Sequence, residues 1–520
     1  MDKVADGIIQ SIAYYIGQDP VRMHMPGHKG RLRRKQGEGR PQGGDEAASH
    51  MSGLVLDALD AVKPLDVTEV PGLDNLHYPS GPIKAVQDAM ADTFGTAATY
   101  CLINGATAGI LASLIAVRMT MGPGMVVVPR NAHRSIISGL ILSGLEPLFV
   151  YPEYDSRFGG YLPLKVSDVQ AQLEKAASEG RRDMAGEGRL CGVVVVNPTF
   201  TGVCRDITEI CEYADGLGVP VIVDEAHGTL FALSERLPRS AIEAGAALVV
   251  HGVHKTTEAL TQTGLLHVTP KCVASFPALA VNVAEALRLV QSTSPSYILL
   301  ASLERAIRSH KHDETWVESM IQSAHLIKGA LSGFRGISVR VPQGAGWDPV
   351  KILVDVSGLG LSGPRVQELL WDEARVVPEM AGPDHVLLMV TGADTSDSVE
   401  KLVKAFRRIS DGCLGLERPG SAGLCSELLT REPPRAERAM PLSRAFYSGS
   451  KDYSLEESVG RVSCDTVMIY PPGSPVVVPG EKITAEIAGY LRAAVECGLQ
   501  VLGRGYACGG EELRVFCLEQ

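Results

Sequence analysis

The stretch "ALVVHGVHKTTEALTQTG", residues 247–264, ends an apolar run on an unusual set of polar side chains. The run is typical of a buried strand, and it is followed by His251, His254, Lys255 and several hydroxyl-bearing residues. A structural lysine usually points to solvent, but the residues around Lys255 do not have the composition of a solvated face. The stretch therefore raises the question of what chemistry a lysine performs at the end of a strand.

The same kind of strand recurs between residues 95 and 290. Short continuous apolar runs alternate there with helical stretches such as 206–217, and the runs lie at 99–103, 125–128, 192–196, 220–223 and 247–250. Continuous hydrophobicity indicates strands that are buried on both faces. We therefore expect an α/β fold with a mostly parallel central sheet covered by helices.

A chain of 520 residues is too long for one core, so several domains are expected. Helical patterns at 297–332 and 363–373, with strands near 351–356 and 386–391, indicate a smaller α+β domain. We predict five parts: an N-terminal segment with a polar, mobile loop at 30–50 (1–60), a large domain (61–295), the small α+β domain (296–410), a Pro/Arg-rich linker (411–439) and a compact C-terminal domain (440–520).

Composition narrows the function classes. The chain has 49 basic and 60 acidic residues, a net charge of −11, which argues against a nucleic-acid partner. Its 11 cysteines are scattered without a C-x-x-C pair, so we expect no disulfide framework, no structural zinc and a reducing compartment. No apolar stretch approaches the roughly 20 residues that span a bilayer, and the N-terminus has no signal-peptide pattern. We expect a soluble cytoplasmic protein.

Polar groups follow all five predicted strands. They are the "NGATAG" turn at 104–109, "RNAH" at 130–133, "NPT" at 197–199, "DEAHG" at 224–228, and finally Lys255. In open parallel sheets, ligands bind beyond the carboxyl ends of the strands. Five polar strand ends at one edge indicate a functional site.

The polar residues at these strand ends suit a ligand that has both a phosphate group and a pyridine ring. The loop of Gly105, Ala106 and Thr107 opens a helix, where free backbone N–H groups bind phosphate, although such turns are also common elsewhere. Asp224 would hold a pyridine nitrogen protonated; alternatively it caps the next helix.

The remaining side chains complete a pyridoxal phosphate site. Lys255 would form an imine with the cofactor aldehyde, although most lysines after strands lie at the surface. His133 would stack on one face of the ring with Ala226 on the other, or it has a structural role. His227 would contact the substrate carboxylate or the cofactor. The ordered combination, rather than any single residue, carries this prediction.

With these residues in place, the chain resembles a family, the fold-type-I pyridoxal phosphate enzymes that decarboxylate ornithine, lysine and arginine, in the short form without an N-terminal regulatory domain. The matching stretches, in order, are "HMPGHKG" (24–30), "DVTEVPGLDNLHYPSGPI" (66–83), "NGATAGILA" (104–112), "PRNAHRS" (129–135), "NPTFTGVCRDI" (197–207), "VDEAHG" (223–228), "HKT" (254–256), "STSPSY" (292–297) and "YPPGSPVVVPGE" (470–481). The resemblance implies that residues 61–295 bind the cofactor and that 440–520 form the decarboxylase C-terminal domain.

The resemblance also implies roles for single residues. Lys255 would be the Schiff-base lysine, Asp224 the partner of the ring nitrogen and His133 the stacked histidine. The phosphate would lie among Ala106, Thr107 and His254, with Ser294 reaching in from a neighbouring subunit. Glu379, in "VVPEMAG", would lie near the substrate side chain. A shared site implies a homodimer at least.

Four positions depart from the family pattern. Ala106, Gly252 and Val253 lack hydroxyls that the family usually places near the phosphate. Since a hydrogen bond to a charged group is worth about 1.5–3 kcal/mol, we expect weaker cofactor binding unless backbone amides or Arg134 compensate. Leu230 replaces a polar residue, which bears on substrate identity.

The expected activity is that of a carboxy-lyase, which converts a basic L-amino acid to its amine and carbon dioxide for polyamine biosynthesis. Arginine is slightly favoured as the substrate, followed by lysine or ornithine. The distal cation would be read by Glu379 or by a carboxylate of the adjacent subunit, one of Asp66, Glu69 and Asp74. Lys255 or His227 would return the proton to Cα.

Two alternatives remain open at this point. Another fold-type-I lyase or aminotransferase would use the same lysine and aspartate. A catalytically weak homologue with a regulatory role would explain the missing hydroxyls at Ala106 and Gly252, although it would have little reason to retain Lys255, Asp224 and His133.

Overall fold

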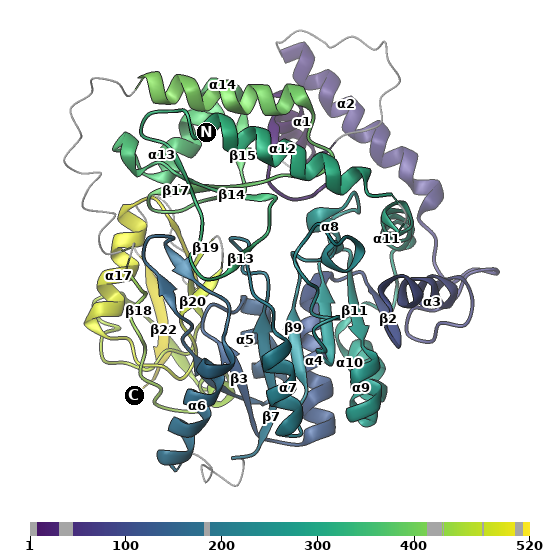
Figure 1. Cartoon of the computed structure of the whole chain (residues 1–520), viewed down its shortest axis with the longest axis vertical. Helices are drawn as coiled ribbons and strands as arrows, with labels where there is room; N and C mark the ends of the chain where they lie inside the picture. The colour runs from purple at the N-terminus through teal and green to yellow at the C-terminus, as the bar shows by residue number, and fades with distance from the viewer. Residues whose placement is uncertain are drawn as a thin grey trace.

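The protein consists of three packed parts, seen in a computed structural model (Figure 1). The structure describes residues 8–30, 45–180, 188–311, 313–412, 429, 431–470, 473–504 and 513–519. The large domain carries the site, the small domain lies over the carboxyl ends of its strands, and the C-terminal domain packs at the side (Figure 1). The predicted domain limits stay a prediction.

The large domain is built on a seven-stranded sheet. In spatial order its strands are β2 (Ala98–Leu102), β11 (Gly264–Val268), β10 (Leu248–His251), β9 (Val221–Asp224), β7 (Leu190–Val196), β3 (Met125–Pro129) and β4 (Glu146–Val150). All neighbours pair in parallel except β11, which is antiparallel to both β10 and β2. The five predicted strands and the mostly parallel sheet are confirmed.

Two helical layers cover the sheet, and this explains the continuous apolar runs. Val126 and Val128 of β3 enter a core with α4 (Gly105–Met121), α5 (Arg134–Ser143) and α10 (Pro277–Val290), next to α9 (Pro270–Ser275). Val127, between them, enters the opposite core with α6 (Val166–Ser178) and α7 (Thr208–Gly216). Successive strand residues point to opposite faces, so both sets must be apolar.

The small domain has an antiparallel sheet of β12 (Ser338–Arg340), β14 (Lys351–Asp355), β17 (His385–Met389) and β16 (Met380–Ala381). Its helices are α12 (Thr315–Leu331), α13 (Gly363–Ala374) and α14 (Ser396–Gly412). The N-terminal α1 (Ile8–Gly17) leads into β1 (Val21–Met23), which pairs in parallel with β15 (Val376–Pro378). The start of the chain therefore joins the small domain.

Two sequence predictions differ from the structure. The pattern at 297–332 forms two helices, α11 (Tyr297–His310) and α12, and Asp313 accepts a hydrogen bond from the Thr315 N–H where α12 begins. Residues 45–50 of the predicted loop lie in α2 (Asp45–Val62), so the loop prediction is wrong there, because "DEAASH" contains good helix formers. Residues 31–44 lie outside the described part of the chain.

The C-terminal domain contains α16 (Leu442–Phe446), the pair β18 (Ser450–Ser454) and β22 (Arg514–Leu518), the sheet β20 (Ser474–Val477), β19 (Val467–Tyr470) and β21 (Gln500–Leu502), and α17 (Ala485–Glu496). It has its own apolar core. Cys497 of this domain is disulfide-bonded, a bond that the sequence did not predict. Of the predicted linker, 413–428 and residue 430 lie outside the described residues.

Short elements complete the architecture. They are α3 (Pro82–Phe94), the hairpin β5 (Tyr154–Asp155) and β6 (Gly160–Tyr161), the pair β8 (Val203–Cys204) and β13 (Gly346–Trp347), and α8 (Val253–Thr256). In the described ranges, no helix combines the length and the apolar character that a membrane crossing needs.

Candidate active site

The carboxyl edge of the large sheet brings the predicted residues together. Asp224 is the last residue of β9, and Lys255 lies in α8, directly after β10. His133 follows β3, and Gly105 opens α4 after β2. Since β11 is antiparallel to both β2 and β10, these two strands run in the same direction as β9 and β3. Their carboxyl ends therefore meet at one edge.

Lys255 stands beside a histidine. Its Nζ lies 3.1 Å from Nε2 of His227. Part of the lysine side chain is accessible, but protein atoms surround its nitrogen closely, and this desolvation lowers its pKa while Asp224 and Glu379 oppose the shift. A lysine with a lowered pKa is a better nucleophile at neutral pH.

His227 lies between two lysines. Its Nδ1 is 3.0 Å from Nζ of Lys351, a residue of β14 in the small domain. The ring also packs edge-on against Phe200, with centroids 5.3 Å apart. Burial, and then the charges of Lys255 and Lys351, hold the pKa of His227 well below its usual value. His227 is therefore a neutral imidazole with both ring nitrogens engaged.

Asp224 is buried and oriented by its own turn. Its Oδ1 accepts a hydrogen bond of 3.2 Å from the Ala226 N–H, while Oδ2 accepts none from the described residues. No α-helix begins directly after β9, so Asp224 does not cap one. One carboxylate oxygen is thus available for the nitrogen of a cofactor ring.

His133 is the N-cap of α5. Its Nδ1 accepts from the Ser135 N–H at 3.2 Å and lies 2.9 Å from the Ser135 hydroxyl. The ring remains exposed at the edge of the site, yet crowding by protein atoms lowers its pKa, and Asp224 opposes this. The structural role considered for His133 is present, and it leaves the face of the ring free for stacking.

The first turn of α4 has the geometry of an anion site. Asn104, its N-cap, makes no capping bond with its side chain, and Gly105 has a φ of +74°. The first N–H groups of a helix have no partner within it, and here Ala106 is half-buried and Thr107 is exposed. The arrangement fits a phosphate group held mainly by backbone amides.

The turn at Gly252 and His254, which the family resemblance places near the phosphate, is tightly packed. A Cβ added to Gly252 would lie 2.9 Å from the carbonyl oxygen of Ala226, so a serine there would need the turn to shift. His254 donates through Nδ1 to the Thr263 carbonyl at 2.8 Å, and burial lowers its pKa to about 4. His254 therefore presents a neutral ring rather than a charge.

The N-terminal "MPGHK" segment closes over the Lys255 turn. The Gly27 N–H donates to the His254 carbonyl at 2.9 Å, and a Cβ at Gly27 would lie only 2.3 Å from the Thr257 oxygen. The Met25 N–H donates to Oε2 of Glu379 at 2.8 Å. This segment, whose role the sequence did not indicate, thus binds Glu379 and packs against the backbone of the turn that carries Lys255.

Ser294 and Asp74 were both expected to act toward the site of a neighbouring subunit, and that role stays a prediction. Ser294 is exposed on a loop that the Ser292 N–H ties to Asn104 of the same chain at 3.2 Å. The Asp74 carboxylate accepts from three backbone N–H groups at the start of α3, those of Ser80, Gly81 and Ile83. Asp74 is thereby occupied, which leaves it poorly suited to bind a substrate.

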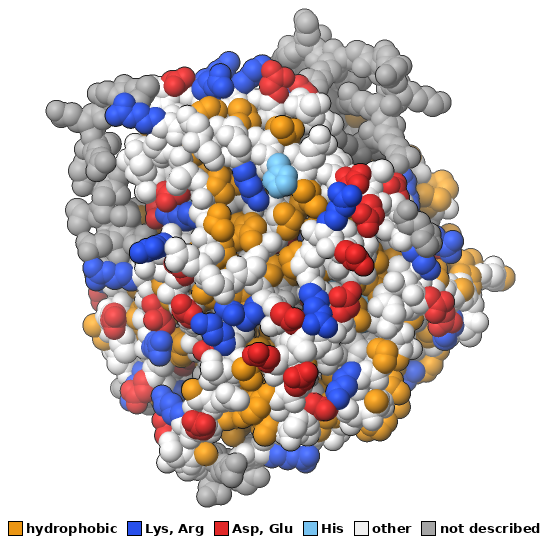
Figure 2. Space-filling view, in the orientation of Figure 1, with side chains coloured by type: hydrophobic (Ala, Val, Ile, Leu, Met, Phe, Trp, Pro, Cys, Tyr) orange, Lys and Arg blue, Asp and Glu red, His pale blue; other side chains and the backbone are white. Residues whose placement is uncertain are grey.

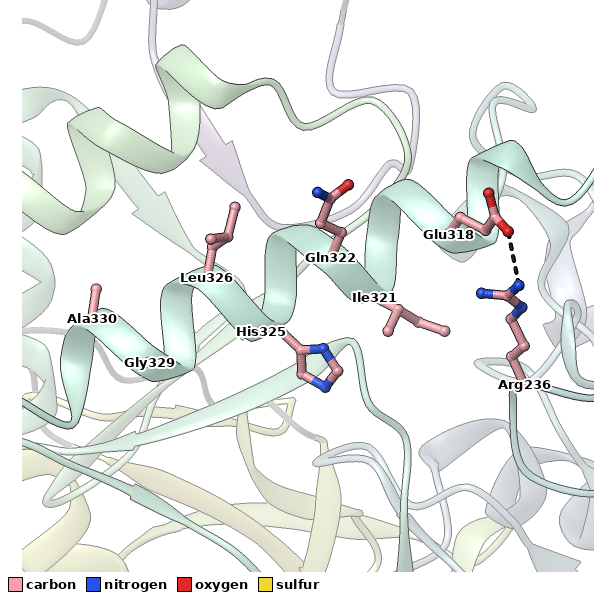
Figure 3. Close-up of a pocket in the computed structure, with 8 residues that line it drawn as sticks. All are labelled: Arg236, Glu318, Ile321, Gln322, His325, Leu326, Gly329 and Ala330. Carbon is pink, nitrogen blue, oxygen red and sulfur yellow. Dashed lines mark ion pairs between the residues drawn. The ribbon is translucent and has the colours of Figure 1, made fainter.

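A separate hollow of about 630 Å³ lies along α12 and contains none of the predicted site residues (Figure 3). Its rim carries the ion pair between Arg236 and Glu318, 2.8 Å apart. The predicted site residues therefore lie elsewhere than in this surface hollow.

The fold and the arrangement of the site residues define the class of protein. A mostly parallel sheet with a lysine after β10, an aspartate at the end of β9 and a helix N-terminus after β2 is the arrangement of fold-type-I pyridoxal phosphate enzymes. Residues 8–344 match the family model described as Orn/Lys/Arg decarboxylase, major domain, and residues 435–506 match its C-terminal domain. The chain belongs to the Orn/Lys/Arg decarboxylase family.

Individual relatives agree with this membership. An arginine decarboxylase of Bacillus anthracis is 31% identical over 494 residues, 94% of this chain and 92% of the relative. A lysine decarboxylase of Pseudomonas aeruginosa is 25% identical, over 82% of this chain and 68% of the relative. The solved constitutive lysine decarboxylase of E. coli superposes with a TM-score of 0.73 at 19% identity, covering 98% of this chain and 82% of that one, which shows the shared fold.

Proposed function

We propose that this chain decarboxylates L-arginine in preference to lysine and ornithine, with pyridoxal 5′-phosphate held at Lys255. The observation that carries the proposal is the enclosed Lys255 nitrogen, 3.1 Å from His227. Lys255 lies in α8, directly after β10, the strand that pairs with β9, which ends at Asp224. Relatives named arginine decarboxylase match nearly the whole chain, whereas the lysine decarboxylase of Pseudomonas aeruginosa is less similar.

Each part of the site would hold one part of the cofactor. The first turn of α4 suits the phosphate, Oδ2 of Asp224 suits the ring nitrogen, and His133 and Ala226 suit the two ring faces. When bound, pyridoxal phosphate supplies an electron sink for the bond between Cα and the carboxylate. The remaining work belongs to the side chains of the chain itself.

That work is mainly proton handling and exclusion of water. Loss of carbon dioxide consumes a proton at Cα, and the nitrogens of Lys255 and His227 are the candidates to deliver it. The segment around Gly27 covers the Lys255 turn through its bond to the His254 carbonyl. A site closed to water strengthens the electrostatic interactions inside it.

Substrate choice would rest on carboxylates. Glu379 has one oxygen bound to the Met25 N–H, so its other oxygen is available to a guanidinium group. Planar guanidinium favours carboxylates placed for paired hydrogen bonds. Asp66 and Glu69 are exposed near the site-bearing domain and would complete such a pair from a second subunit.

We also propose that the working unit is a homodimer or a larger homo-oligomer with shared sites, acting in the cytoplasm on a route to polyamines. Large apolar side chains are exposed on α2 and the segment after it: Leu54, Leu56, Leu59, Leu65 and Tyr78. Figure 1 places α2 at the rim of the molecule, where a second copy can cover these side chains.

The test is carbon dioxide release with added pyridoxal phosphate from arginine, lysine and ornithine offered separately. Arginine should give the highest kcat/KM, and Lys255→Ala should abolish release. Lys271→Ala is the matched control, because Lys271 is a partly exposed lysine that forms an ion pair with Asp215 at 2.7 Å. Protein that binds the cofactor and releases no carbon dioxide from any of the three would refute the proposal.

A further inference from the structure

Lys351 is a fully buried lysine whose charge the proposed chemistry does not use. It belongs to β14 of the small domain and has no exposed surface. Its Nζ lies 3.0 Å from Nδ1 of His227, 3.4 Å from the sulfur of Met389 and 5.4 Å from the ring centroid of Phe200. Its contacts in the described chain include no carboxylate at ion-pair distance. Such an ammonium is expensive to bury, so a reason for its presence is needed.

The hydrogen bonds around His227 restrict the protonation of both lysines. A neutral imidazole has one N–H donor and one lone pair, and His227 is neutral because burial, the largest cause of its lowered pKa, opposes its charged form. Two ammonium groups cannot both donate to a single lone pair. One of Lys255 and Lys351 must therefore be a neutral amine that accepts the imidazole N–H.

The groups around the Lys351 nitrogen indicate that Lys351, and not Lys255, is the protonated lysine of the pair. The face of the Phe200 ring and the sulfur of Met389 both favour a cation. Burial lowers the pKa of Lys351 to about 8, so the residue remains protonated at neutral pH. The charged groups that act on it are Glu379 and Asp348, which raise its pKa, and Lys255 and Lys29, which lower it.

We propose that Lys351 is a positioning residue that sets the tautomer of His227. By donating to Nδ1, it places the imidazole proton on Nε2, which donates to the Lys255 nitrogen and holds that nitrogen as a neutral amine. The proposal rests on the role of Lys255 as the cofactor lysine, since only a neutral amine bonds to an aldehyde. Through this contact, a residue of the small domain acts on the chemistry of the large domain.

The experiment follows the association of pyridoxal phosphate with cofactor-free protein by absorbance across a range of pH. In Lys351→Met, the midpoint of the rate profile should rise by about one pH unit, and the rate at neutral pH should fall roughly tenfold. Lys351→Gln should recover part of the rate, because its amide N–H donates to Nδ1. The control is Lys328→Met, a neighbouring lysine that donates to the Pro349 carbonyl at 2.7 Å and does not touch His227.

Two results would overturn the assignment. One is a Lys351→Met profile that overlays the wild-type profile. The other is a loss of rate in both Lys351 variants with an unchanged midpoint, which would indicate packing alone. If the wild-type protein binds pyridoxal phosphate but releases no carbon dioxide, the proposed function fails while the midpoints still decide the role of Lys351.

Discussion

At the scale of the residue, the chemistry that lies within single motifs can be located from the sequence. Lys255, Asp224 and His227 follow strands, and their spacing along the chain indicates their roles. Lys351 was not found, because it begins an ordinary strand pattern and reaches His227 from 124 residues away in sequence. Met389 likewise ends an ordinary strand pattern, and Phe200 lies in a quoted motif that gives no sign of its contact with Lys351.

Burial of the Lys351 ammonium should also lower the free energy of unfolding of the protein. Its pKa falls from 10.5 to about 8 in the folded protein, equivalent to about 3 kcal/mol. The lowered value means that the penalty is fully present below about pH 8 and vanishes as the pH rises through 10.5. Lys351→Met should therefore be more stable than wild type near neutral pH by about 1–3 kcal/mol, with the difference shrinking at higher pH.

Urea unfolding of both proteins at neutral and alkaline pH measures this difference. A Lys351→Met protein that is less stable than wild type near neutral pH would contradict it. Such a result would mean that the ammonium contributes more through its contacts than its burial costs.

At the scale of the element, a buried chain of hydrogen bonds ties four neighbouring strands together. Glu225, just after β9, accepts from His251 Nε2 at 2.8 Å, and His251 Nδ1 lies 3.0 Å from His267 Nε2. His267 Nδ1 lies 2.8 Å from the Thr99 hydroxyl. Burial, and then His251, keep the pKa of His267 well below its usual value. All donors can therefore point toward the Glu225 carboxylate.

Removing one member of this chain should leave its neighbours unpaired. We expect His267→Leu to lower the free energy of unfolding by about 2–4 kcal/mol, measured by urea denaturation. His325→Leu is the control, because His325 is an exposed residue of α12. Equal stability of the two variants would mean that the chain of hydrogen bonds is dispensable.

The N-terminal "MPGHK" segment yields a second prediction at this scale. Gly27→Ala places a Cβ against the Thr257 carbonyl, so the segment should move away from α8 and loosen its cover over Lys255. Affinity for pyridoxal phosphate, measured by absorbance titration, should fall at least tenfold. Gly53→Ala, in α2 with no atom within 4 Å of the added Cβ, should bind as wild type does. Unchanged affinity in Gly27→Ala would show that the segment does not cover the site.

The strands and helices could largely be predicted from hydrophobic pattern, but their directions could not. The run at 264–268 is not among the predicted strands, and nothing in it reveals that β11 is antiparallel to its neighbours. The break between α11 and α12 depends on a local hydrogen bond of Asp313, which an apolar pattern does not report.

At the scale of the whole molecule, a buried ion pair joins the C-terminal domain to the active-site edge. Arg130, directly after β3, donates to Oε2 of Glu481 at 2.8 Å and to the Val476 carbonyl at 2.8 Å. Both charged side chains are buried. The "PGE" motif therefore holds the C-terminal domain against the strand end that carries His133.

Neutralising one member leaves the other charge buried and uncompensated. Glu481→Gln should destabilise the protein by about 3–5 kcal/mol and lower the urea midpoint. Glu486→Gln, at the start of α17 and exposed, is the control. If the two variants unfold alike, the ion pair does not hold the domain in place.

The family motifs and their order could be identified in the sequence. The contacts that hold the domains against one another could not be predicted from it. The partnership of Arg130 with Glu481 spans 351 residues, and the pairing of β1 with β15 also joins distant parts of the chain. On the face shown in Figure 2, basic and acidic side chains are intermixed, in keeping with the charge balance that argued against a nucleic-acid partner.

The most direct measurement of the central claim is borohydride reduction of the protein loaded with pyridoxal phosphate, followed by peptide mass mapping. We expect a stable phosphopyridoxyl group on the peptide that contains Lys255, and none in Lys255→Ala. A label on Lys351, Lys29 or a surface lysine instead, or a protein that retains no label, would contradict the assignment of Lys255 as the cofactor lysine.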